Sequence, residues 1–212
     1  MDVLVVRHPL VADRLSRLRD ERTDNASFGR LTAELSALLA YEALGDLGVV
    51  ETRISTPVVA DVASPKVAES PLLVPVLRAG LGMVPAVGAL LPMADVSHLG
   101  LRRNEKTLEP SLYLDALPKA LSGRRVVVCD PMLATGGTLV AVCDLLAARG
   151  AGPIIVLCLI ASQPGLERLE SAHPGGVRVV CAAVDAELDG RGYIVPGLGD
   201  AGDRLFGPPP DA

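Results

Sequence analysis

The residues best suited to chemistry lie in a short loop that follows an apolar run. Asp130 opens this loop, and Thr135, Gly136, Gly137 and Thr138 close it just before a predicted helix. At a helix start the free backbone N–H groups can converge on an anion, glycines let the backbone approach a phosphate, and threonine hydroxyls add donors. No lysine follows the glycines, which excludes the P-loop of nucleoside triphosphatases. The pattern therefore indicates a local site for a monophosphate.

Asp130 suggests what accompanies that phosphate. A carboxylate would repel the phosphate itself, but it can accept hydrogen bonds from vicinal sugar hydroxyls a short distance away. Phosphate next to ribose is thus the ligand that fits. The alternative is a tight strand-to-helix turn in which Asp130 only caps the helix, and these nine residues alone favour neither interpretation.

The surrounding pattern predicts the elements that position this loop. An apolar strand over 125–129, a helix over about 139–148 and a strand over 154–160 form a βαβ unit with parallel strands. Further buried strands are expected at 71–77 and 177–183. We therefore predict an α/β fold with a doubly wound, mainly parallel sheet flanked by helices. Such sheets bind ligands at the carboxyl ends of their strands, where the loop lies.

Other segments complete the predicted organisation. Amphipathic helices are expected over about 11–21 and from residue 28 onward, where leucines recur at three- and four-residue spacing. Residues 49–70 carry two prolines and suit short edge strands or an arm. Asp185, Glu187 and Asp189 alternate in a turn and are expected to form a solvated acidic loop.

Composition bounds the class of protein. The 212 residues, 1–212, are expected to form a single domain, and with 50% hydrophobic residues they are not intrinsically disordered. A net charge of −5 and 2% aromatics argue against nucleic-acid binding, and the apolar runs are too short to span a membrane. Four cysteines in apolar surroundings, without metal-ligand spacing, favour buried thiols and a cytoplasmic location.

The phosphate loop, from the apolar run before it to Thr138, closely resembles that of the uracil phosphoribosyltransferase family, a branch of the type I phosphoribosyltransferases. A single acid at the start of the loop, in Cys129-Asp130-Pro131-Met132, is the form this branch uses where many phosphoribosyltransferases carry two. Five further segments resemble the family in the same order: residues 8–11, 38–42, 76–82, 103–110 and 192–203.

The resemblance implies an enzyme that transfers the 5-phosphoribosyl group of 5-phosphoribosyl-1-pyrophosphate (PRPP) to N1 of uracil. The products are UMP and pyrophosphate, and the process is pyrimidine salvage. The catalytic residues it implies are Arg78, Arg103, Asp130 and Asp200. PRPP would be bound by Arg78, Arg103, Asp130, Pro131, Met132, Leu133, Ala134, Thr135, Gly136, Gly137, Thr138 and Asp200. Uracil would be bound by Tyr193, Ile194, Gly199, Asp200 and Ala201.

Family analogy places Arg78 and Arg103 on pyrophosphate oxygens, which a guanidinium can contact in bidentate fashion. For Arg103, next to Arg102 in a polar loop, the sequence does not decide between this role and a surface arginine. The glycine pattern over 197–202 matches a dinucleotide fingerprint, but too few residues follow it for a βαβ unit. The resemblance assigns it instead to the pyrimidine edge.

The resemblance also implies partners. Mg²⁺ would be the cofactor, bound mainly through PRPP with no certain protein ligand. The fold would carry a small hood made of N- and C-terminal segments, the chain would form a dimer or tetramer, and GTP is a possible effector. Lys106 stands where relatives often have an acid. Two alternatives stay open: the same PRPP site with another base, and a regulatory relative that binds RNA, which the acidic balance disfavours.

Overall fold

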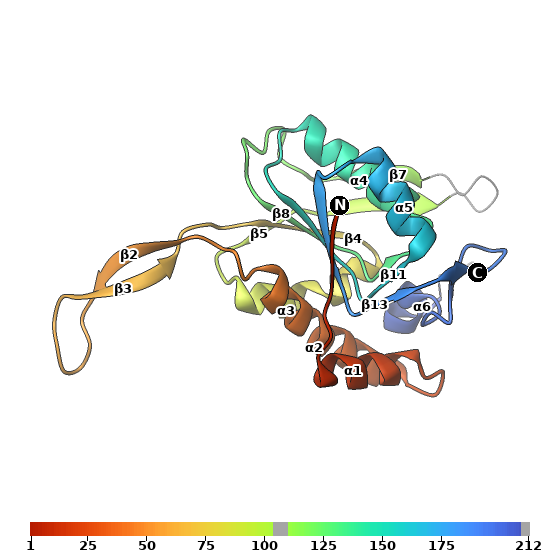
Figure 1. The fold of residues 1–212 in the computed structure, drawn as a ribbon, viewed down its shortest axis with the longest axis horizontal. Coiled ribbons are helices and arrows are strands. Elements are labelled where there is room, and N and C mark those ends of the chain that lie inside the picture. The colour runs from red at the N-terminus through yellow and green to blue at the C-terminus, as the bar shows by residue number, and fades with distance from the viewer. Residues whose placement is uncertain (104–109, 209–212) are drawn as a thin grey trace.

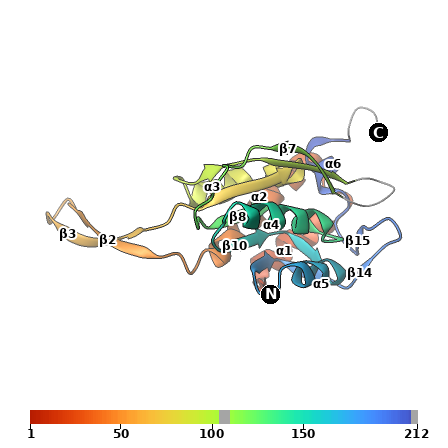
Figure 2. The ribbon, with the colours of Figure 1, turned by 90° about the horizontal axis from the view of Figure 1, so that it is seen from above.

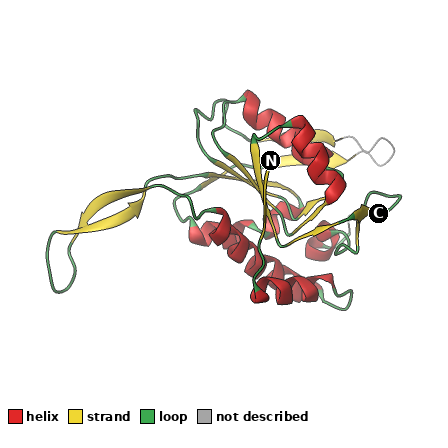
Figure 3. Ribbon diagram, in the orientation of Figure 1, coloured by secondary structure: helices red, strands yellow, loops and turns green. Residues whose placement is uncertain are grey.

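The computed structural model describes residues 1–103 and 110–208, and its centre is an eight-stranded sheet (Figures 1 and 3). Seven strands follow one another across it in the order β1 (Asp2–Val5), β12 (Val177–Cys181), β10 (Ile154–Leu157), β8 (Val126–Cys129), β4 (Leu72–Leu77), β6 (Leu99–Arg103) and β7 (Pro110–Asp115). The eighth, β5 (Asp95–Val96), also pairs with β4.

All pairings of this sheet are parallel except that of β6 with β7. The register is continuous across the centre, where Leu72 pairs with Val126, Val126 with Ile154, and Ile154 with Val177. The central strands β8, β10 and most of β4 are buried along their whole length. Strands covered on both faces read as unbroken apolar runs, which explains why these were recognisable.

Helices cover both faces of the sheet (Figures 1 and 2). One face carries α4 (Gly137–Ala148) and α5 (Gln163–Ala172); the other carries α1 (Pro9–Arg19), α2 (Asn25–Ala43), the 3₁₀ helix η1 (Ala79–Gly82), α3 (Val84–Leu90) and α6 (Ala201–Phe206). Successive residues of β4 alternate between the two cores, since Leu72 belongs to the core on the side of α4 and α5 and Leu73 to the core on the side of α1 and α2. The predicted doubly wound α/β fold is confirmed.

The strands predicted over 154–160 and 177–183 are each two strands. β10 is followed by β11 (Ile160–Ser162) and β12 by β13 (Ala183–Asp185). These later pieces leave the main sheet and join β9 (Met132–Leu133) in a three-stranded parallel sheet ordered β13-β11-β9. The prediction missed the break between β10 and β11 because the apolar run continues through the buried Cys158 and Leu159, which separate the two strands.

Residues 49–67 form the arm that the prolines suggested. β2 (Val49–Ile54) and β3 (Val62–Val67) pair only with each other, antiparallel, and project from the body (Figures 1 and 2). A second short pair, β14 (Glu187–Leu188) with β15 (Ile194–Val195), lies near the C-terminus. Among the described residues no helix combines the length and apolar character needed to cross a membrane.

Candidate functional site

The predicted phosphate loop joins β8 to α4, as the sequence indicated. Gly136 has a φ of +77° and is the residue before the first turn of α4, which begins at Gly137. This left-handed conformation is strained for any residue with a Cβ, so glycine is required there. The first amides of α4 have no partner within the helix and face the loop, which is the arrangement that binds anions.

Helix α5 supports this loop from behind, a contact that the sequence analysis missed. The hydroxyl of Ser162 donates to the Ala134 carbonyl (2.6 Å) and accepts from the Gly165 amide (2.9 Å). A Cβ on Gly165 would lie 2.2 Å from the Ala134 oxygen, so only glycine permits this approach. The available signal was Ser162 itself, a typical cap residue before a helix whose first turn contains proline.

Asp130 lies at the carboxyl end of β8, at the start of the same loop. Among the described residues the only hydrogen bond of its carboxylate is a long one, 3.4 Å, accepted from the Met132 amide. Burial therefore dominates and raises the pKa of the carboxyl to about 7, with the Met132 bond opposing it. The preceding Cys129 thiol is buried as well, and burial raises its pKa to about 12. Asp130 thus has unused acceptor capacity that a ligand hydroxyl could fill.

Arg78 stands at the carboxyl end of β4, next to β8 in the sheet, so it shares an edge with Asp130. Its guanidinium donates to the Asp203 carboxylate (3.1 Å) and to the Gly207 carbonyl (3.4 Å). The residues that follow Arg78 pack closely against the end of β8, because a Cβ on Gly80 would lie only 2.2 Å from the Cys129 oxygen. The fold therefore joins Arg78 to the C-terminal segment that the resemblance singled out.

The predicted base loop, residues 193–201, runs from β15 into α6. Ile194 and Ala201 are buried, whereas Tyr193 is 37% exposed. Asp200 caps α6, since its Oδ1 accepts from the Asp203 amide (2.9 Å). Gly199 has a φ of +79°, so the loop turns there in a conformation that favours glycine.

An ion pair holds this loop in place and corrects one prediction. Asp185 is not part of a solvated acidic loop: it ends β13, is 8% exposed, and pairs with Arg19 through two bonds of 2.7 and 2.8 Å. Arg19 also donates to the Gly197 carbonyl (2.7 Å), and the Gly197 amide donates to Asp185 (3.2 Å). Both backbone polar groups of Gly197 are thus satisfied, and the buried Asp185 carboxylate is fully paired, which makes its burial tolerable.

A second arginine ties the same loop to the N-terminal helices. Arg204 donates to the carbonyls of Leu18 (2.5 Å) and Leu198 (2.8 Å), and its guanidinium lies 4.3 Å from the centroid of the Phe28 ring. N- and C-terminal segments therefore pack together beside the base loop, which agrees with the predicted hood. Burial lowers the pKa of Arg204. The guanidinium is nevertheless accommodated, because its N–H groups donate to backbone carbonyls.

Two residues named from the sequence cannot be placed in the site. Arg103 ends β6, but its side chain lies outside the described residues, as does the whole of Lys106. The pyrophosphate contact expected of Arg103 stays a prediction. No cluster of three metal-ligating side chains occurs in the part of the chain that the structure describes.

The sequence model of the uracil phosphoribosyltransferase family matches residues 5–208 of this chain. The chain belongs to that family. Curated uracil phosphoribosyltransferases from Beutenbergia cavernae and Corynebacterium glutamicum are 54% and 50% identical to it over 209 residues. These alignments cover 98% of this chain and 99% and 98% of the two relatives.

Solved structures agree with the fold. A protein of Aquifex aeolicus superimposes with a TM-score of 0.90 at 37% identity, covering 97% of this chain and 98% of that one. The adenine phosphoribosyltransferase of Trypanosoma brucei, solved with AMP, pyrophosphate and ribose 5-phosphate, gives 0.57 at 14% identity, covering 86% and 82%. At that identity the likeness concerns the fold alone, which is that of the type I phosphoribosyltransferases.

Proposed function

We propose that this chain transfers the 5-phosphoribosyl group of PRPP to N1 of uracil, releasing UMP and pyrophosphate, a step of pyrimidine salvage. Family membership over nearly the whole chain supports the reaction. The observation that carries the proposal in the structure is a shared edge: the glycine loop that begins α4, Asp130 and Arg78 all follow the neighbouring strands β8 and β4. Sugar phosphate and pyrophosphate can thus be bound side by side.

Each group in the site suits one part of this chemistry. The amides and hydroxyls of residues 135–138 would bind the 5-phosphate, with the rest of the loop, residues 131–134, shaping the pocket, and Asp130 would accept from the ribose hydroxyls. Cleavage of the anomeric C–O bond leaves positive charge on the ribose and negative charge on the departing pyrophosphate. Arg78 and Arg103 would stabilise the latter, and Asp200 would face the ribose or the base.

Uracil would be recognised by the loop over 193–201. Its glycines expose backbone N–H and C=O groups that complement the carbonyls and N3–H of a pyrimidine edge. Ile194, Gly199 and Ala201 would supply these contacts together with Asp200, and the exposed ring of Tyr193 would flank the base.

We propose Mg²⁺ as the cofactor. Mg²⁺ usually keeps several waters and binds through one or two carboxylates plus substrate phosphates. Asp130 and Asp200 fit this requirement, and no dedicated protein cage is needed. When bound with PRPP, the ion would share the negative charge of the leaving group.

UMP formation by the purified protein with PRPP, Mg²⁺ and uracil tests the function. Cytosine, hypoxanthine and orotate serve as parallel substrates. Turnover with uracil alone is expected. Turnover with another base would keep the phosphate loop and overturn the base loop, and no turnover despite PRPP binding would favour a regulatory relative.

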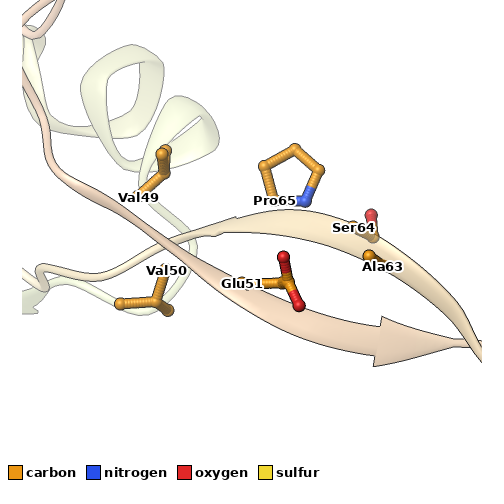
Figure 4. Close-up of a pocket in the computed structure, with 6 residues that line it drawn as sticks. All are labelled: Val49, Val50, Glu51, Ala63, Ser64 and Pro65. Atoms are coloured by element: carbon orange, nitrogen blue, oxygen red, sulfur yellow. The ribbon is translucent and has the colours of Figure 1, made fainter.

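We propose further that the chain is a homo-oligomer in which the arm packs on a second copy. An isolated two-stranded hairpin is marginally stable in water, yet this one exposes Val58 (90%), Val59 and Val49. Figure 4 shows an open hollow on it, lined by side chains of both strands, including Val50 and Pro65. The double variant Val58→Ser/Val59→Ser should dissociate in sedimentation analysis, and an unchanged mass would contradict the arm's role.

Two finer expectations remain proposals. GTP would act as an effector if it changes the rate of UMP formation, which adding GTP to the same assay would reveal. The four cysteines are all buried and free, which suits a reducing compartment, so we propose a cytoplasmic location.

A further inference from the structure

The face of α5 that supports the phosphate loop ends in an arginine that no part of the proposed mechanism uses. Ser162, Gly165 and Arg168 recur every three residues and all contact the loop. Arg168 donates to the Thr135 carbonyl (3.4 Å). Its side chain is exposed, so this long bond leaves most of its donors available.

The guanidinium lies directly on the first residue of α4. A Cβ built on Gly137 would be 3.3 Å from Nη1 and 3.4 Å from both Cζ and Nη2 of Arg168. Three nearly equal distances mean that the planar group lies flat over that position. Because Cα–Cβ bonds tilt toward the N-terminus of a helix, the charge sits beside the amides expected to bind phosphate.

The positive charge of Arg168 is electrostatically unfavourable next to the N-terminus of α4 when no anion is bound. The N-terminus of a helix carries partial positive charge, which disfavours lysine and arginine there and favours anions. Within residues 1–103 and 110–208 no carboxylate forms an ion pair with Arg168. The carboxylates beside it have other partners: Glu167 accepts from Gln163, and Glu170 pairs with the N-terminal ammonium.

We propose that Arg168 binds the 5-phosphate of the phosphoribosyl substrate. This inference rests on the proposed function, because it takes the loop over 135–138 as the 5-phosphate cradle. A short in-plane movement of an exposed side chain, away from the Thr135 carbonyl, would give the phosphate a charged donor beside the neutral amides. Gly137 then has a second purpose besides backbone approach, since a Cβ there would press on the guanidinium and displace it by a few tenths of an ångström.

The test compares Arg168→Gln with the wild type and with Arg30→Gln, an exposed helical arginine whose partner is Glu34. Glutamine keeps the first carbons of the side chain and a polar end, but it removes the guanidinium and its charge. Calorimetric titrations use ribose 5-phosphate and, separately, pyrophosphate with Mg²⁺. Losing one charge-assisted hydrogen bond should weaken ribose 5-phosphate binding about tenfold, and pyrophosphate binding by less than about twofold. Arg168→Lys should restore much of the affinity.

The outcomes separate this contact from the function on which it rests. Unchanged ribose 5-phosphate affinity in Arg168→Gln, or an equal loss for both ligands, overturns the contact while wild-type turnover with uracil still supports the enzyme. A wild-type protein that binds neither ligand and makes no UMP refutes the proposed function and the contact together. Thermal unfolding of the variant should match that of Arg30→Gln, since neither side chain is buried.

Discussion

Replacing Asp130 with asparagine should stabilise the empty protein above pH 7 and weaken its binding of the sugar phosphate. Burial raises the pKa of this carboxyl from 3.8 to about 7. Between those values the folded chain holds a proton that the unfolded chain has released, so the free energy of unfolding falls as the pH rises. At about 1.4 kcal/mol for each unit of pKa shift, the proton on Asp130 contributes at most about 4 kcal/mol to the free energy of unfolding. This contribution is fully present below about pH 4 and is lost as the pH rises to about 7.

The ligand has the opposite dependence. Ribose hydroxyls donate to the ionised carboxylate, so the affinity for PRPP should rise as the pH passes about 7 in the wild type. Asparagine has nearly the same shape but neither titrates nor offers a charge. The variant should therefore show weaker PRPP binding with little of this pH dependence.

Urea unfolding between pH 5 and 8.5, with PRPP titrations at the same pH values, measures both effects. Asp13→Asn, at an exposed carboxylate of α1, is the matched control. An Asp130→Asn variant less stable than the wild type at pH 8, or equal losses of stability in both proteins between pH 5 and 8, would refute a buried carboxyl that titrates near pH 7.

Three further substitutions probe the supports of the site. Asp185→Asn leaves Arg19 without its buried partner and should cost about 3 kcal/mol of unfolding free energy while raising KM for uracil more than for PRPP. Gly165→Ala forces a Cβ against the Ala134 carbonyl, so PRPP affinity measured by calorimetry should fall at least about tenfold. Phe28→Ala should lower the free energy of unfolding in urea by about 3–5 kcal/mol, because this fully buried ring fills the core beside the Arg204 guanidinium.

Each of these has an outcome that contradicts it. Equal changes in both KM values would show that the Asp185 pair does not act through the base loop. Unaltered PRPP affinity in Gly165→Ala would mean that α5 does not set the position of the phosphate loop. A loss below about 1 kcal/mol for Phe28→Ala would place the ring outside the cooperative core.

Local sequence sufficed for the central strands and the phosphate loop. The apolar run 125–129 and the glycines at the start of α4 could be interpreted from neighbouring residues in the sequence alone. The Arg19–Asp185 pair could not be predicted, because its members are 166 residues apart and only the folded chain brings them together. The single-domain organisation, the individual site roles and the Arg103 contact stay predictions.

The break between β10 and β11 also could not be predicted from the sequence, although the residues involved are close together in the chain. Residues on both sides of it are equally apolar and buried, so hydropathy stays constant while the hydrogen-bond partners change. The amides of Leu159 and Ile160 both donate to the Pro131 carbonyl, which turns the chain toward β9. Such a change of partner depends on tertiary structure alone.

The small sheet β13-β11-β9 connects the two ligand loops and fixes the distance between them. β9 belongs to the phosphate loop, β11 leads into the helix behind it, and β13 ends in Asp185, which holds the peptide of Gly197 in the base loop. The separation between phosphate and base is thereby set by backbone ladders, whose spacing does not depend on side-chain identity. Side chains around the base can then diverge during evolution without altering how far apart the two ends of a nucleotide are held.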